Sequence, residues 1–254
     1  MGSGGSMQTQ NLIHKYALSG PGTMSLTILI LDTETNGLPK NRYAPISEPG
    51  VFPAILQLSW SIYKVEGRSL TAISSRDIGI ALDPSVPWDA GAAKVHGIPE
   101  RAARSGTPSA EALRDLRTAL YSVDVVVAHN LAFDKMVLRA AGYATGIADL
   151  RSLWPPGIKE FCTMMATRDL VRIPATAKQA QYADLGRFKA PKLNELYTWL
   201  YGHVYDMSGS VLHTAASDTH CLAQCLSALL RRGHLEAVDG ALRLSMAAIT
   251  TSVA

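Results

Sequence analysis

The sequence predicts an α/β domain, because three strand-like segments come first and helical patterns alternate with a further strand after them. Residues 26–38 (LTILILDTETNGL) are apolar at consecutive positions and then turn polar, which is typical of a central strand buried on both faces. Residues 54–67 and 71–82 are further strand candidates, joined by a loop around Gly67. The three strands are expected to form an antiparallel meander.

Helical patterns begin after Pro87. In residues 108–122, Pro108 suits a helix start and leucines recur at helical spacing. Residues 123–129 (VDVVVAH) return to a strand pattern, and residues 178–187 are expected to form a surface loop. The remaining predicted helices cover residues 88–98, 132–141, 161–173, 190–202 and 215–230.

Length and composition favour one domain with a large core. The chain has 254 residues, of which 47% are hydrophobic and 18% are charged. Residues 1–25 begin with MGSGGS and lack a usable periodicity, so we expect a disordered leader or tag there, a catalytic domain over residues 26–233 and a C-terminal extension over residues 234–254. No apolar run approaches the ~20 residues that span a bilayer, so we expect a soluble protein without a membrane partner.

Charge and cysteine content narrow the protein class only slightly. A formal net charge of +3 is compatible with a polyanionic partner but does not identify one. Three cysteines cannot all pair, which favours a reducing, intracellular compartment. Cys221 and Cys225 lie one helical turn apart without a further Cys/His cluster, so neither a disulfide framework nor a zinc site is expected.

Four carboxylates occupy apolar segments, where isolated charges are costly. Asp32 and Glu34 are two residues apart on a predicted strand and point the same way, whereas Asp134 and Asp218 fall on the apolar stripes of their helices. Hard divalent cations prefer such oxygen ligands, and a pair of them assists phosphodiester hydrolysis. His213, five positions before Asp218, is the candidate general base, because imidazole titrates near neutral pH. The sequence therefore predicts a two-metal nuclease.

An alternative treats each carboxylate separately, as a capping or surface residue. Asp134, near a helix start, occupies a respectable capping position. Independent placement of all five residues at such positions is improbable, so we prefer the shared metal site.

Three segments, DTETNG, HNLAFD and HTAASD, resemble in this order the three motifs of the DEDDh 3′-to-5′ exonucleases. This DnaQ-like family belongs to the RNase H-like superfamily and includes replicase proofreading subunits and TREX-type enzymes. The segments KVHGIPE and KAPKLNELYTWLYG are also similar to family segments, and the resemblance covers most of the chain from Leu26 to about Gly233.

The resemblance implies an RNase H-like α/β fold, with a mixed five-stranded sheet flanked by helices. It further implies that Asp32, Glu34, Asp134 and Asp218 bind two Mg²⁺ or Mn²⁺ ions, and that His213 is the general base. Thr214 stands where the tyrosine branch of the family has its base, so the histidine branch is indicated.

Four further residues are candidates for substrate binding. Leu38 resembles the apolar wedge that packs against terminal bases in relatives, although it could be an ordinary loop leucine. Asn130 and Phe133 are candidates for contact with the terminal nucleotide, with helix capping and core packing as their respective alternatives. His96 is a candidate for the lining of the nucleotide pocket.

Three functions follow. The preferred one is a metal-dependent exonuclease that removes nucleoside 5′-monophosphates from the 3′ end of single-stranded or mismatched DNA, in proofreading or in repair. The second is the same chemistry on RNA ends, and the third is a nucleic-acid-binding scaffold without catalysis. The resemblance also suggests a homodimer or a polymerase as a protein partner.

Overall fold

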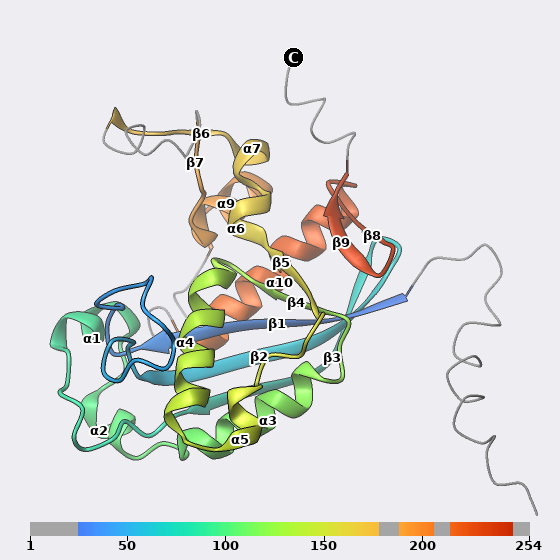
Figure 1. The fold of residues 1–254 in the computed structure, drawn as a ribbon. Helices are drawn as coiled ribbons and strands as arrows, with labels where there is room; N and C mark the ends of the chain where they lie inside the picture. The colour runs from blue at the N-terminus through green and yellow to red at the C-terminus, as the bar shows by residue number, and fades with distance from the viewer. Residues whose placement is uncertain (1–24, 178–187, 206–213, 246–254) are drawn as a thin grey trace, which may run out of the picture.

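The computed structural model describes residues 25–177, 188–205 and 214–245, and a five-stranded sheet lies at its centre (Figure 1). The strands in chain order are β1 (Ser25–Thr35), β2 (Ile55–Glu66), β3 (Ser69–Gly79), β4 (Val125–Ala128) and β5 (Lys159–Cys162). Their order in the sheet is β3-β2-β1-β4-β5. The first three strands pair antiparallel, whereas β4 runs parallel to β1 and β5 parallel to β4. The predicted α/β class, the meander and the mixed five-stranded sheet are confirmed.

Helices cover both faces of this sheet (Figure 1). One face packs against α9 (Leu193–Tyr201) and α10 (Ala215–Arg231), and the other packs against α3 (Ser109–Leu120) and α4 (Leu131–Ala144).

None of the helices in the described part of the chain combines the length and hydrophobicity that a membrane crossing requires. The short elements are α1 (Ala90–His96), α2 (Glu100–Arg104), α5 (Ala148–Arg151), α6 (Thr163–Ala166), α7 (Arg168–Val171), β6 (Ile173–Pro174), β7 (Phe188–Lys189), β8 (Leu235–Val238) and β9 (Ala241–Leu244).

Strand β1 is buried on both faces, which explains its unbroken apolar run. Ile28 and Ile30 belong to the core beneath α10, whereas Leu29 and Leu31 belong to the core beneath α3 and α4. All four side chains are fully buried. Because successive strand residues point to opposite faces, each layer receives every second residue.

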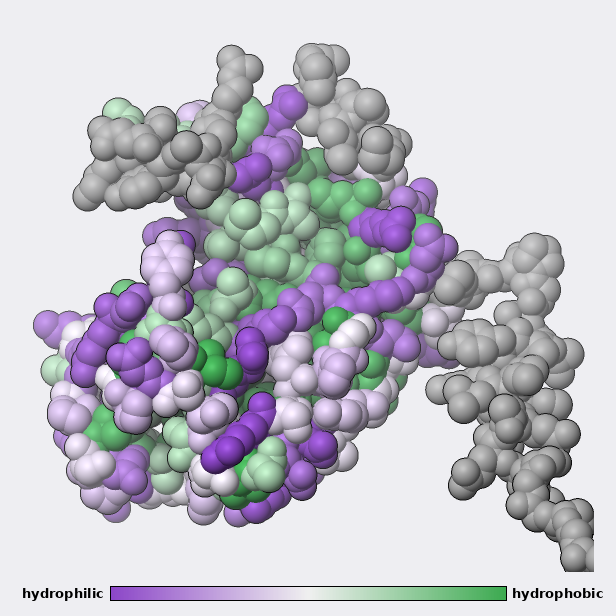
Figure 2. Space-filling view, in the orientation of Figure 1, coloured by the Kyte–Doolittle hydropathy of each residue, from purple (hydrophilic) through white to green (hydrophobic). Residues whose placement is uncertain are grey.

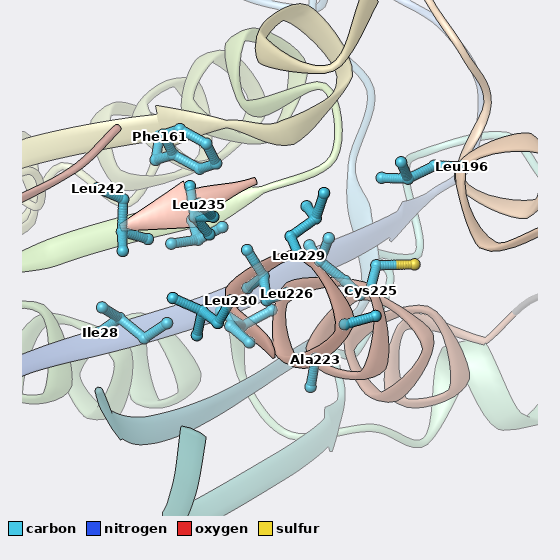
Figure 3. Close-up of a cluster of buried hydrophobic side chains, with 14 of the residues drawn as sticks. Ile28, Phe161, Leu196, Ala223, Cys225, Leu226, Leu229, Leu230, Leu235 and Leu242 are labelled. Carbon is cyan, nitrogen blue, oxygen red and sulfur yellow. The ribbon is translucent and has the colours of Figure 1, made fainter. Parts of the chain in front are cut away.

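The C-terminal hairpin of β8 and β9 extends the core around α10 (Figure 3). Leu235 and Leu242 pack there with Phe161 and the leucines of α10. The two strands are joined by Asp239 and Gly240, both with positive φ, as a tight hairpin turn requires. These residues come from the segment that we expected to be a C-terminal extension.

The predicted helix over residues 161–173 is wrong at its start. Residues 159–162 form β5, in which Phe161 pairs with Val127 of β4, and two one-turn helices follow. A strand of four residues is too short for its periodicity to be visible in the sequence. The surface loop expected at 178–187 lies outside the described residues.

Gly142 has no side chain, and this allows α4 to approach α5 closely. A Cβ atom at Gly142 would lie 2.3 Å from the carbonyl oxygen of Leu150. Alanine normally stabilises a helix interior by about 1 kcal/mol relative to glycine, but here the clash should reverse the sign. We expect Gly142→Ala to lower the free energy of unfolding by about 1–3 kcal/mol in a denaturant titration.

Gly79→Ala is the matched control, because a Cβ atom there has no heavy atom within 4 Å. Its free energy of unfolding should stay within about 1 kcal/mol of wild type or rise. Equal stability of the two variants would contradict the close approach of α4 and α5.

Candidate active site

Asp32 and Glu34 lie at the carboxyl end of β1. They continue the alternation of Ile28 and Ile30, so their side chains face the layer of α10. Both are partly exposed, in contrast to the fully buried residues before them. The end of the central strand therefore delivers two carboxylates to an accessible edge of the sheet.

Helix α10 brings Asp218 to the same place. Thr214 is its N-cap: the Thr214 hydroxyl accepts a hydrogen bond from the Ser217 N–H at 3.1 Å, and Ser217 Oγ accepts one from the Thr214 N–H. Asp218 lies in the first helical turn, so the cap holds its carboxylate at a defined position.

Strand β2 anchors this helix start through residues that the sequence analysis missed. The Gln57 side-chain oxygen accepts a hydrogen bond from the Ala215 N–H at 3.1 Å, and the hydroxyl oxygens of Ser59 and Thr219 lie 3.3 Å apart in the interior. Gln57 and Ser59 stand opposite Glu34 and Asp32 in the sheet register. Polar residues at alternate positions of an otherwise apolar strand were the available signal.

Asp134 approaches from the other helical layer. It lies in the first turn of α4, is 3% exposed, and accepts a hydrogen bond of 2.8 Å from the Thr33 hydroxyl. Thr33 stands between Asp32 and Glu34 but points to the opposite face of β1. One strand thus provides two carboxylates to the site and a hydroxyl that orients a third.

Three carboxylates converge most closely. One oxygen each of Asp32, Glu34 and Asp218 lies within 4.8 Å of the other two. Asp134 is outside that group, yet it is near enough to act electrostatically on Asp32 and Glu34. The structure therefore brings together all four of the predicted carboxylates, whereas His213 lies outside the described residues.

The proximity of these groups disfavours their charged forms. Burial raises the pKa of Asp32 well above its ordinary value, and the neighbouring carboxylates raise it further. Burial raises the pKa of Glu34 to about 8, with added repulsion from Asp218 and Asp134. Burial also raises the pKa of Asp134 to about 7, against the opposing effect of the hydrogen bond from Thr33. Desolvation and mutual repulsion act in the same direction.

This site fits a divalent cation. Partly desolvated carboxylates repel one another unless positive charge lies between them. The donors are carboxylate oxygens only, which suits Mg²⁺ or Mn²⁺ better than soft metals. Asp32, Glu34 and Asp218 could hold an ion directly, with Asp134 beside them.

The loop after β1 meets α1 near the site. Gly37 in the loop lies close to Asp89, whose carboxylate caps α1: a Cβ atom added at Gly37 would be 3.5 Å from that carboxylate. Leu38 follows in the loop and is 80% exposed, whereas His96 at the end of α1 is 2% exposed. Figure 1 shows α1 and the loop side by side at the end of β1.

Asn130 and Phe133 differ in their surroundings. Asn130 precedes α4 in the left-handed region, with φ of 75°, and its side chain makes no cap hydrogen bond. Asn130 therefore occupies the N-cap position of α4 without side-chain capping, and its contact with a nucleotide stays a prediction. Phe133 is half-buried and packs against the core beneath α4.

His129 fixes the chain around the start of α4. Its Nε2 donates to the Pro191 carbonyl at 2.9 Å, which leaves Nδ1 to accept from the Thr163 hydroxyl at 3.0 Å. Burial lowers the pKa of His129 to about 4, so the ring is neutral at physiological pH. The ring joins the end of β4 to α6 and to the segment before α9.

No model of a known protein family matches the chain, and no curated protein matches its sequence. Solved structures do match its fold. A 3′-exonuclease that recognises the 3′ end of the histone mRNA stem-loop superimposes with a TM-score of 0.57 at 12% identity, covering 94% of this chain and 76% of that one.

Exonuclease I structures match a smaller share of their own length. The Escherichia coli enzyme with a dT13 oligonucleotide gives a TM-score of 0.57 at 16% identity, and the enzyme from Methylocaldum szegediense gives 0.54 at 16%. These alignments cover 80% and 82% of this chain but only 41% of each exonuclease I chain. The chain therefore has the RNase H-like fold that these 3′-exonucleases share.

The raised pKa values generate a prediction for the metal-free protein. The pKa of Glu34 rises from 4.5 to about 8, so the folded protein keeps a proton that the unfolded chain releases within this range. The free energy of unfolding in EDTA should therefore fall as pH rises from about 5 to 8, by a few kcal/mol in order of magnitude. Added Mg²⁺ should restore stability, and thermal unfolding should show a larger Mg²⁺ effect at the higher pH.

Asp32→Asn should unfold at a higher temperature than wild type in EDTA at about pH 8, because one repelling charge is gone, and it should lose most of the Mg²⁺ effect. Glu111→Gln, at an exposed position of α3, is the matched control and should behave as wild type. If Mg²⁺ raised the unfolding temperature equally at both pH values, the proposed coupling between carboxylate protonation and Mg²⁺ binding would be contradicted.

Proposed function

We propose that the protein is a metal-dependent 3′-to-5′ exonuclease that hydrolyses the terminal phosphodiester bond of a DNA 3′ end and releases nucleoside 5′-monophosphates. The observation that carries this proposal is the convergence of the Asp32, Glu34 and Asp218 carboxylates within 4.8 Å. The fold shared with 3′-exonucleases, two of them described with oligonucleotide or RNA substrates, adds support.

In this proposal Asp32, Glu34, Asp134 and Asp218 hold two Mg²⁺ or Mn²⁺ ions. Such ions, when bound, supply charge neutralisation at the phosphate and a more acidic water. The carboxylates themselves bind as anions, and the Thr33 hydroxyl orients Asp134 for this role. A bound zinc ion in an E. coli exonuclease I–single-stranded DNA complex is compatible with a cation site in this fold.

His213 is proposed as the general base. It directly precedes Thr214, the N-cap of the helix that carries Asp218. An imidazole in its neutral form would take the proton of the attacking water, which leaves the carboxylates free to stay ionised. A protonated His213 could not act in this way, so activity should fall on the acidic side of neutrality.

RNA is the second candidate substrate, and one comparison favours it. The alignment with the histone mRNA 3′-exonuclease covers a larger share of this chain and of the matched chain than the alignments with exonuclease I do. The 2′-hydroxyl contacts that separate RNA from DNA are specific to each site. The third candidate, a scaffold without catalysis, agrees poorly with the presence of all four carboxylates.

The decisive assay digests 5′-labelled single-stranded DNA, mismatched duplex DNA and RNA side by side. With Mg²⁺ we expect stepwise shortening from the 3′ end, abolished by EDTA and reduced at least about a hundredfold in Asp32→Ala, because that variant lacks a ligand for the ions that neutralise the phosphate. His213→Ala should reduce the rate about 100- to 10,000-fold.

Glu111→Gln again serves as the control and should retain full activity. If no substrate is shortened, the proposed exonuclease activity is refuted, and the nucleic-acid-binding scaffold is the remaining candidate function. A His213→Ala rate equal to wild type would refute the proposed base, and preferential digestion of RNA would replace DNA as the substrate.

We further propose that His96 contacts the bound nucleotide. Its Nδ1 accepts a hydrogen bond from the Ile98 N–H at 3.0 Å, so the proton lies on Nε2, which has no partner among the described residues. Burial lowers the pKa of His96, which favours this neutral form. An unpaired buried donor at the end of α1 is suited to a ligand acceptor.

His96→Asn tests this contact, because asparagine can still accept from the N–H two residues ahead but cannot reach the position of Nε2. We expect KM for the oligonucleotide to rise about 2- to 10-fold with little change in kcat. His96→Gln, whose amide extends further, should recover part of the affinity. An unchanged KM in His96→Asn would assign the histidine to packing against Trp88 alone.

The suggested protein partners, a second copy of the chain or a polymerase, stay predictions from the resemblance. Sedimentation of the purified protein tests the first, and co-purification with a polymerase tests the second.

A further inference from the structure

The segment between β1 and β2 is a defined loop beside the carboxylate site. At its base, the Asn36 N–H donates to the Ala54 carbonyl at 3.0 Å, and the Asn36 side-chain oxygen accepts from the Ala54 N–H at 2.7 Å. Further out, the Lys40 N–H donates to the Val51 carbonyl at 3.0 Å. The loop therefore leaves the sheet two residues after Glu34 and returns to the same edge.

The tip of this loop presents an aromatic ring to solvent. Tyr43 is 82% exposed, and its N–H donates to the Asn41 side chain at 2.9 Å, which stabilises the local turn. The Arg42 guanidinium carbon lies 4.9 Å from the centre of the Tyr43 ring. The guanidinium occupies one face of the ring, so the other face is free to stack on a planar ligand.

The charges of the loop suit an anionic ligand. Lys40 and Arg42 are exposed, and Glu48 is the only acidic residue between Asn36 and Ala54. The carboxylates of the site repel a polyanion in their charged forms, so cations on the neighbouring loop favour the entry of such a ligand. An aromatic face next to cations is the combination that binds single-stranded nucleic acid.

A second arginine–tyrosine pair, Arg117 and Tyr121, resembles Arg42 and Tyr43 but lies elsewhere on the protein. Tyr121 is 50% exposed, and the Arg117 guanidinium carbon lies 4.6 Å from its ring centre. Tyr121 precedes β4, whose first residue pairs with Ile28, so it lies at the end of the sheet opposite the carboxylates. The same chemistry thus occurs both beside the site and remote from it.

We propose that Tyr43 stacks on an unpaired nucleobase of the substrate, a few nucleotides on the 5′ side of the scissile bond, with Lys40 and Arg42 near the adjoining phosphates. This inference rests on the proposed exonuclease function and narrows it to ends with a single-stranded 3′ tail, because a base inside a duplex is stacked on both faces by its neighbours. Stacking on an aromatic face is tolerant of sequence, so any base can occupy this position.

A binding experiment without cleavage tests the stacking. Single-stranded DNA carrying 2-aminopurine at successive positions from its 3′ end is titrated with full-length protein, with Ca²⁺ in place of Mg²⁺. Wild type should quench the fluorescence at one position upstream of the end. Tyr43→Ala should lose this quenching and raise Kd about 5- to 100-fold, whereas Tyr43→Phe should retain both. Tyr121→Ala is the matched control and should equal wild type.

Two outcomes would overturn the inference: quenching and Kd in Tyr43→Ala equal to wild type, or equal losses in Tyr43→Ala and Tyr121→Ala.

Hydrolysis of the small diester thymidine 5′-(p-nitrophenyl phosphate) separates this inference from the proposed function, because that substrate does not reach Tyr43. If wild type fails to hydrolyse it and fails to shorten DNA, the exonuclease is refuted, while Tyr43-dependent quenching would still support the stacking. If Tyr43→Ala hydrolyses it at the wild-type rate but binds DNA weakly, both proposals stand.

Discussion

The burial of β1 between two helical layers is the constraint on which the rest of the molecule depends. Each face of the strand receives every second residue, so Ile30 continues into Asp32 on the α10 side and Leu31 continues into Thr33 on the α4 side. A shift of one residue in the pairing with β2 would send the two carboxylates to the wrong layer. The same alternation that builds the core thus assigns the ligands.

The carboxylates placed in this way work against the stability of the metal-free fold. Burial raises the pKa values of Asp32, Glu34 and Asp134, and repulsion between carboxylates adds to the rise at Asp32 and Glu34. Their charged forms therefore cost free energy that the surrounding core must offset. Ile28 and Ile30 of β1 pack with the leucines of α10 in one hydrophobic cluster, on the same elements that carry Asp32, Glu34 and Asp218 (Figure 3). The packing of β1 against α10 therefore holds these carboxylates together despite their repulsion.

Polar contacts complete the support where the hydrophobic layer ends. Gln57 and Ser59 of β2 hold the first turn of α10 in place, and Thr33 holds Asp134. Outside this rim the surface is mixed, with hydrophilic and apolar residues side by side over α4 and the loop after β1 (Figure 2). The site thus extends from the buried Asp134 to the partly exposed Asp32 and Glu34 at the end of β1.

Local periodicity in the sequence was enough to predict the strand that ends in two carboxylates, the meander of the first three strands and the helices of the last two motifs. The folded chain adds contacts that the sequence pattern does not contain: Asp32, Glu34 and Asp218 converge within 4.8 Å, Thr33 donates to Asp134, and Gln57 accepts from the first residue of α10. Thr33 and Asp134 lie 101 positions apart, and Gln57 and Ala215 lie 158 apart, so these contacts depend on sheet register and helix packing, which no local pattern contains. The short strand β5 was missed for a related reason: its pairing with β4 stabilises it, and four residues show no period of their own.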